Sequence, residues 1–105
     1  MKKINVVQIG IGHDHAPMIF ESLKKSTDFF DIKGYCLVDN EREKFAGLLT
    51  VFDGYEELNI DEVFADNCID AVLVETEEEY LTKYALLAAK SGKHIHMDKP
   101  GGIGL

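Results

Sequence analysis

The pattern of apolar and polar positions predicts short strands that alternate with helices. Residues 4–9 and 71–74 form almost continuous apolar runs, which are typical of strands buried on both faces, as in a parallel sheet. Because strands and helices alternate, we expect βαβ units with right-handed crossovers and a doubly wound parallel α/β sheet of about five strands. The other predicted strands are 32–38, 49–52 and 93–97, and the predicted helical segments are 16–25, 41–48, 55–58, 60–65 and 78–90.

A glycine turn follows the first predicted strand. Gly10 and Gly12 flank Ile11, and a helix is predicted to begin near Ala16. The first glycine permits a tight turn, and the second allows a phosphate to approach the backbone and the helix N-terminus. His15 replaces the third glycine of the dinucleotide-binding pattern. We therefore predict that Gly10, Ile11 and Gly12 hold a pyrophosphate, and the alternative is a glycine turn without a ligand.

Two histidines, His13 and His15, lie in the same turn. Positions two apart do not share a helical face, and a third protein ligand is not evident, so we predict no metal site. A histidine beside a pyrophosphate can instead donate a hydrogen bond to it. Both histidines are therefore predicted to bind the cofactor.

An acidic residue, Asp39, directly follows the second predicted strand. A carboxylate at this place can accept hydrogen bonds from the adenosine ribose of a dinucleotide. It would repel a 2′-phosphate, so NAD is favoured over NADP, although Arg42 nearby leaves NADP possible. Alternatively, Asp39 only caps the next helix.

Asp98, Lys99 and Pro100 follow the last predicted strand. Ligands of open α/β sheets bind outside the carboxyl ends of the strands. Lys99 is therefore predicted to project toward the crevice of the glycine turn, where a lysine can anchor a substrate oxygen or relay a proton. The alternative is an ordinary loop.

Composition and charge narrow the class of protein. The chain has 105 residues, one domain's worth, and a net charge of −8, which argues against nucleic acid because phosphate backbones need a basic face. Cys36 and Cys68 form no CxxC pair, and both are predicted to be buried in a reducing compartment. Apolar runs are far shorter than the ~20 residues of a membrane span. We therefore expect a cytoplasmic protein.

Several segments together resemble the Gfo/Idh/MocA family of NAD(P)-dependent oxidoreductases, which act largely on sugars and polyols. These segments are 69–74, Thr76, 85–95 and the Asp98-Lys99-Pro100 motif, and the match runs in register from Met1 to Pro100. The resemblance implies a Rossmann domain for NAD or NADP, with Lys99 as the active-site lysine and Thr76 near the cofactor. The predicted cofactor-binding residues are Gly10, Ile11, Gly12, His13, His15, Asp39, Thr76, Lys99 and Pro100, and the predicted catalytic residue is Lys99.

The chain departs from the family pattern after Thr76. Glu77, Glu78 and Leu81 replace the usual proline, asparagine and histidine, which favours the alternative of a non-catalytic binding or interaction module. Family members continue into a second α/β domain that supplies the substrate pocket. We therefore expect residues 1–105 to be the cofactor-binding part of a sugar or polyol dehydrogenase, inactive alone. Its last strand would be an open edge that favours self-association.

Overall fold

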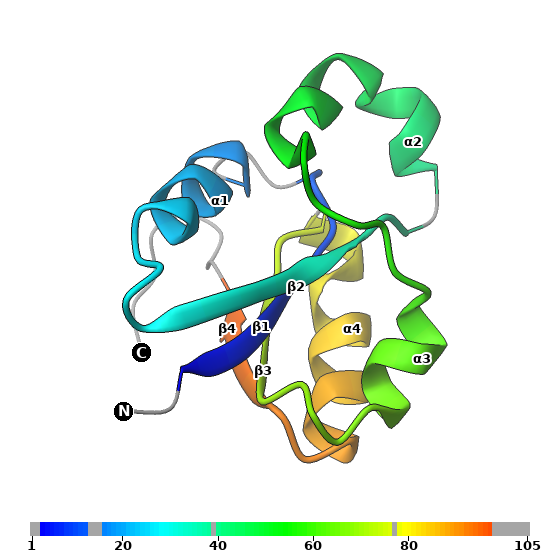
Figure 1. The fold of residues 1–105 in the computed structure, drawn as a ribbon. Helices are drawn as coiled ribbons and strands as arrows, with labels where there is room; N and C mark the ends of the chain where they lie inside the picture. The colour runs from blue at the N-terminus through cyan, green and yellow to red at the C-terminus, as the bar shows by residue number, and fades with distance from the viewer. Residues whose placement is uncertain (1–2, 13–15, 39, 77, 98–105) are drawn as a thin grey trace.

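The computed structural model describes residues 3–12, 16–38, 40–76 and 78–97 (Figure 1). Their strands form one parallel sheet in the order β2-β1-β3-β4, which confirms the predicted doubly wound α/β class. The strands are β1 (Ile4–Ile9), β2 (Phe30–Cys36), β3 (Ala71–Val74) and β4 (His94–Met97). The helices are α1 (Ala16–Lys24), α2 (Glu41–Lys44), the 3-10 helix η1 (Ala46–Phe52), α3 (Ile60–Ala65) and α4 (Glu78–Lys90).

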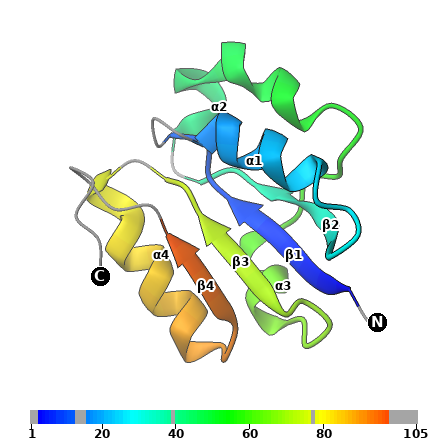
Figure 2. The same ribbon diagram turned by 90° about the vertical axis from the view of Figure 1, so that its left-hand side faces the viewer.

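Helices cover both faces of the sheet (Figure 2). Successive side chains of β1 point to opposite faces, so Val7 joins the core beneath α3 and α4, and Val6 joins the core beneath α1. The first core also contains Ile9, Cys36, Val63, Val72, Val74, Tyr84 and Ala88, and the second contains Ile11, Ala16, Phe20, Leu23, Phe52 and Leu73. The crossovers therefore leave the carboxyl ends of all four strands at one edge of the sheet.

The predicted strand at 49–52 is wrong, because these residues belong to η1. Phe52 stacks on Tyr35 with ring centroids 4.0 Å apart and meets the edge of Phe20 at 4.7 Å. A short apolar run cannot be assigned to strand or helix by its pattern alone. Here the aromatic contacts favour a helical turn that buries Phe52, and the described sheet has four strands.

The predicted helical turns at 55–58 are also wrong. Glu57 forms an isolated parallel bridge with Tyr35, and Leu58 donates a 2.7 Å backbone hydrogen bond to the Tyr35 carbonyl. The segment therefore runs along β2. In addition, β2 begins and ends two residues before its predicted limits, and α2 ends at Lys44 rather than at residue 48.

The helix α3 has a defined start. The side-chain oxygen of Asn59 accepts hydrogen bonds from the backbone N–H groups of Asp61 at 2.9 Å and Glu62 at 3.2 Å. Such a cap satisfies N–H groups that lack partners within the helix. The two acidic side chains also suit the positive end of the helix dipole.

The cysteines differ from their prediction. Cys36 is buried, whereas Cys68 is exposed, because it lies in the loop before β3 rather than in a strand. Burial raises the pKa of the Cys36 thiol to about 12. The prediction of two buried cysteines is therefore correct only for Cys36.

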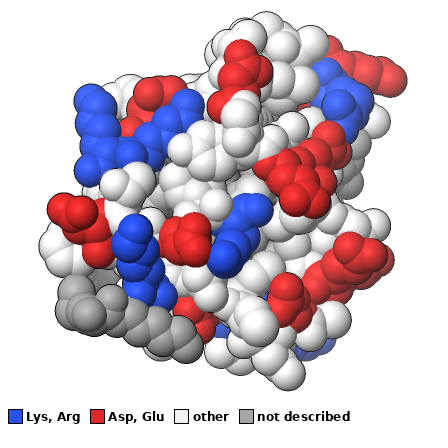
Figure 3. All heavy atoms as spheres, viewed as in Figure 1, with Lys and Arg blue, Asp and Glu red and all other residues white. Residues whose placement is uncertain are grey.

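The charge distribution on the surface and the hydropathy of the helices are relevant to binding of nucleic acid and membranes. On the face shown in Figure 3, Lys and Arg side chains are interspersed with Asp and Glu, so this face has no continuous basic area. None of the described helices is long and apolar enough to cross a membrane.

Candidate functional site

The glycine turn packs against the end of β3. Gly10 has a φ of +93°, and a Cβ added there would lie 2.6 Å from Thr76 Cγ2 and 2.9 Å from Thr76 N. The backbone N–H of Glu75 donates to the Ile9 carbonyl at 2.8 Å, which continues the β1–β3 pairing up to this point. Glycine is therefore required here, and the structure brings the predicted residues Gly10 and Thr76 into contact.

The backbone N–H groups of the turn converge on the Glu41 carboxylate. Ile11 and Gly12 each donate a hydrogen bond of 3.0 Å to Glu41 Oε2, and Val38 donates one of 2.9 Å to Glu41 Oε1. Only 2% of Glu41 is exposed. A residue at the start of α2 thus ties the end of β2 to the turn after β1.

The sequence analysis did not identify Glu41. An acidic residue in the first turn of a helix is common because it suits the helix dipole, and Glu43 in the same short helix has the same character. A buried carboxylate with three backbone donors becomes evident only when β1 and β2 are placed side by side.

The turn has the geometry of an anion site. Two consecutive backbone N–H groups aimed at one carboxylate oxygen form a small anion-binding concavity, and in this structure the Glu41 carboxylate occupies it. The Gly10 N–H donates to the Cys36 carbonyl at 2.8 Å. A cofactor oxygen held by Ile11 and Gly12 would therefore take the place of the Glu41 carboxylate.

The side chain of Gln8, in β1, hydrogen-bonds to the backbone on both sides of the turn. Its Nε2 donates to the Gly10 carbonyl at 3.0 Å and to the Ala16 carbonyl at 3.4 Å, and the residue is fully buried. Its Oε1 has no hydrogen-bond partner among the described residues. The available signal was a polar residue inside a buried apolar strand, since such residues are expected to have a specific partner.

The start of α2 bears on the role of Asp39. The N-cap residue of α2 is Asn40, and its side chain makes no capping hydrogen bond. Asp39 lies outside the described residues, so both of its possible roles, ribose binding and helix capping, stay predictions. Arg42, the cation next to Glu41, forms an ion pair with Glu57. This partner raises the pKa of the Arg42 guanidinium above its usual value.

The other predicted site residues cannot be compared with the structure. His13, His15, Asp39, Lys99 and Pro100 lie outside the described residues, and their roles stay predictions. The described part of the chain ends with β4, at Met97, two residues before Lys99 in the sequence.

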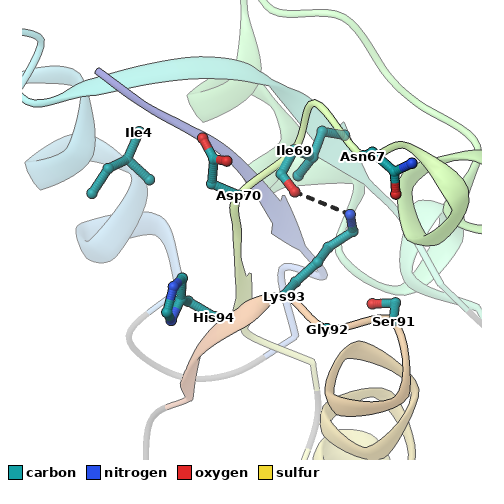
Figure 4. A pocket seen from close by; sticks show the side chains of 8 residues that line it. All are labelled: Ile4, Asn67, Ile69, Asp70, Ser91, Gly92, Lys93 and His94. Carbon is teal, nitrogen blue, oxygen red and sulfur yellow. Dashed lines mark hydrogen bonds between the residues drawn. The ribbon is translucent and has the colours of Figure 1, made fainter. Parts of the chain in front are cut away.

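A hollow of about 390 Å³ lies at the other end of the strands, where their amino ends meet (Figure 4). There, Lys93 Nζ donates to the backbone carbonyls of Asp66 at 2.6 Å and Ile69 at 3.0 Å. Asp70 Oδ2 accepts the backbone N–H of Asn5 at 3.0 Å. These charged groups are engaged with backbone, and ligands of open α/β sheets bind at the carboxyl ends instead. We therefore place the candidate site at the glycine turn.

Comparison with protein families identifies the family of this chain. The family model described as "Oxidoreductase family, NAD-binding Rossmann fold" matches residues 4–102. The chain belongs to the Gfo/Idh/MocA oxidoreductase family. The predicted family is thereby confirmed, and the domain is an NAD-binding oxidoreductase domain.

Solved structures share the fold at low sequence identity. An NAD-binding protein from Listeria innocua is 26% identical, with a TM-score of 0.70 over 94% of this chain and 28% of its own. The WlbA dehydrogenase from Bordetella pertussis, in complex with NADH and UDP-GlcNAcA, is 18% identical, with a TM-score of 0.71 over 94% of this chain and 29% of its own. Biliverdin reductase from Synechocystis, in complex with biliverdin and NADP+, is 20% identical, with a TM-score of 0.71 over 92% of this chain and 29% of its own.

These neighbours set the scope of the comparison. The chain spans only 28 to 29% of the length of the three structures. Their complexes contain NADH or NADP+, which is consistent with the predicted cofactor NAD, or NADP. No match was found among curated proteins.

Proposed function

We propose that this chain is the cofactor-binding part of an NAD(P)-dependent dehydrogenase that acts on a sugar or polyol. The observation that carries the proposal is the glycine turn, where Ile11 and Gly12 direct two backbone N–H groups at one oxygen of the Glu41 carboxylate, a position that a cofactor phosphate oxygen would take over. The turn lies at the carboxyl ends of parallel strands, where dinucleotides bind in such sheets. The match to an NAD-binding family over residues 4–102 supports the same assignment.

The turn after β1 and Asp39 bind the cofactor in this proposal, with Asp39 accepting hydrogen bonds from the adenosine ribose. Gly10, Ile11 and Gly12 hold the dinucleotide, with His13 and His15 as further donors from the same turn. The bound nicotinamide supplies hydride chemistry.

The substrate end of the proposed site depends on the residues after β4. Lys99 polarises the substrate oxygen or relays its proton, next to Pro100, while Thr76 supports the turn through Gly10. A sugar substrate is supported by the WlbA dehydrogenase, whose complex contains UDP-GlcNAcA. The substrate pocket belongs to the second domain that the family resemblance implies.

A titration followed by NADH fluorescence tests this proposal on the 105-residue chain. We expect saturable binding that ADP reverses, because ADP contains both the pyrophosphate that the turn would hold and the adenosine ribose that Asp39 would contact. Nicotinamide mononucleotide, which lacks that half, is the matched control and should compete poorly. The proposal is wrong if neither NADH nor NADPH binds at millimolar concentration.

A second candidate is a Rossmann-like binding or interaction module without catalytic activity. It is supported by Glu77, Glu78 and Leu81, which stand where the family pattern has proline, asparagine and histidine. The same titration separates the two functions, since failure to bind either dinucleotide would favour the module.

We also propose that the chain self-associates through β4. In the described sheet β4 is an edge strand, and such an edge can pair with another chain. Ile95 of β4 and Ile4 of β1 are 39% and 42% exposed, and both line a hollow of about 290 Å³ whose other lining residues are almost all apolar. Light scattering should show a dimer or larger species that Ile95→Lys weakens, whereas a monomer at high concentration would contradict this proposal.

A further inference from the structure

We propose that the Glu41 carboxylate is an internal competitor of the cofactor, so that the chain without cofactor is held in an autoinhibited form. This inference rests on the proposed function and adds a regulatory contact to the same site. A dinucleotide phosphate is held by backbone N–H groups at a glycine turn. The N–H groups of Ile11 and Gly12, which would hold it here, both donate to Glu41 Oε2 at 3.0 Å.

The contact closes the turn to a second anion. Glu41 is 2% exposed and Ile11 is fully buried, so a phosphate cannot reach the two donors while the carboxylate is in place. Two anions on one pair of donors would also repel each other strongly, because water is largely excluded there. Cofactor binding at this turn therefore requires the carboxylate to leave.

Displacement of the carboxylate has a cost that the cofactor repays only in part. A phosphate oxygen can accept the N–H groups of Ile11 and Gly12, but the N–H of Val38 donates to the other carboxylate oxygen at 2.9 Å. Val38 is 5% exposed, so its N–H would lose a charged acceptor where water has little access. The affinity of a ligand falls with the fraction of molecules whose site is open. Glu41 thus stabilises the fold and weakens cofactor binding.

The helix that contains Glu41 is weakly attached elsewhere. In α2 only Glu41 is buried, and the side chain of the N-cap residue Asn40 makes no capping hydrogen bond. The ion pair of Arg42 with Glu57 is exposed, and such pairs contribute little to stability. Segments with few buried contacts shift at low free-energy cost. A shift of α2 can therefore release the carboxylate into solvent without unfolding the sheet.

The first experiment compares the full chain with Glu41→Gln in NADH affinity and in stability to urea. Glutamine has nearly the same size but no charge, and its amide NH₂ would face a backbone N–H at one end of the contact. We expect the variant to be less stable and yet to bind NADH about tenfold more tightly. The loss of a purely structural residue would instead weaken both. Glu43→Gln, in the same helix but exposed, is the matched control and should change neither.

Hydrogen exchange of the unmodified chain, measured by NMR, covers the case in which Glu41→Gln does not fold. Ligand binding stabilises the folded state and ordinarily slows amide exchange. Saturation with NADH should instead speed the exchange of the Val38 amide, because its acceptor Glu41 has been displaced. The Asp70 amide, which donates to the Asn5 carbonyl at the amino ends of the strands, is the control and should not exchange faster.

The outcomes separate this inference from the proposed function. If NADH binds but folded Glu41→Gln binds it no more tightly, or if the Val38 amide exchanges no faster in the complex, the competition is overturned and the proposed function stands. If neither NADH nor NADPH binds to the unmodified chain or to the variant, both are overturned.

Discussion

At each end of the parallel strands, a buried charged side chain is held by backbone groups. At the carboxyl ends of the strands, Glu41 is 2% exposed and accepts three backbone N–H groups. At the amino ends, Lys93 is 8% exposed and donates to two backbone carbonyls. The charges are opposite, and so are the backbone groups that meet them.

This difference in backbone groups explains why only the carboxyl ends of the strands are suited to an anionic ligand. The turn after β1 directs two N–H groups at the Glu41 carboxylate, and the same donors would suit a cofactor phosphate oxygen that took its place. The loop before β3 presents carbonyls, and the Lys93 ammonium closes it as an internal contact (Figure 4). We infer that substitutions at the carboxyl ends change binding as well as stability, whereas those at the amino ends change stability alone.

The largest effect is expected from Gly10→Ala at the turn. An alanine at a φ of +93° is strained, and its Cβ would lie 2.6 Å from Thr76 Cγ2 and 2.9 Å from the Thr76 backbone. Strain and clash together should lower the free energy of unfolding by about 3 kcal/mol. Gly54→Ala is the control, because Gly54 has a φ of +88° but no atom within 4 Å of the added Cβ. Urea unfolding should show a cost of about 1 kcal/mol for this control, and equal costs would contradict the packing argument.

A smaller loss of stability is expected from Lys93→Met at the opposite edge. Methionine retains most of the side-chain volume but leaves the Asp66 and Ile69 carbonyls without their ammonium donor. The free energy of unfolding should fall by about 2 kcal/mol. The exposed Lys25→Met is the control and should change it by less than about 0.5 kcal/mol. In folded protein NADH affinity should be unchanged, and a loss of affinity would contradict a purely structural role for Lys93.

The sequence predicted the elements whose pattern is strong. The strands 4–9 and 71–74 and the helix 78–90 were predicted with the observed limits, because long runs of apolar or amphipathic residues leave one interpretation. Segment 49–52 was assigned wrongly, since four apolar residues fit a strand or a helical turn equally well. Its actual form depends on contacts of Phe52 with Phe20 and Tyr35, which are distant in sequence.

The candidate site was predictable only in part for the same reason. Gly10 and Gly12 could be predicted from the sequence, because glycines directly after a buried strand form a local pattern. Glu41 and Gln8 act through contacts with the turn that arise when β1 and β2 pair. Spacing along the chain contains no direct signal for such contacts, so the sequence did not predict Glu41 or Gln8 as parts of the site.

The smallest expected effect is a difference in alkylation between the two cysteines, which lie at opposite ends of the strands. Cys36, the last residue of β2, is buried near the turn, whereas Cys68 is exposed before β3. Burial raises the pKa of the Cys36 thiol to about 12, so folding favours its neutral form. This stabilisation is complete below the ordinary thiol pKa of about 8.5 and is lost as the pH rises toward 12.

At pH 8.5, mass spectrometry after iodoacetamide treatment should find modified Cys68 and intact Cys36, and Cys68→Ser should abolish labelling until the chain is denatured. Labelling of Cys36 in the folded chain would show that the carboxyl edge opens more readily than its packing implies.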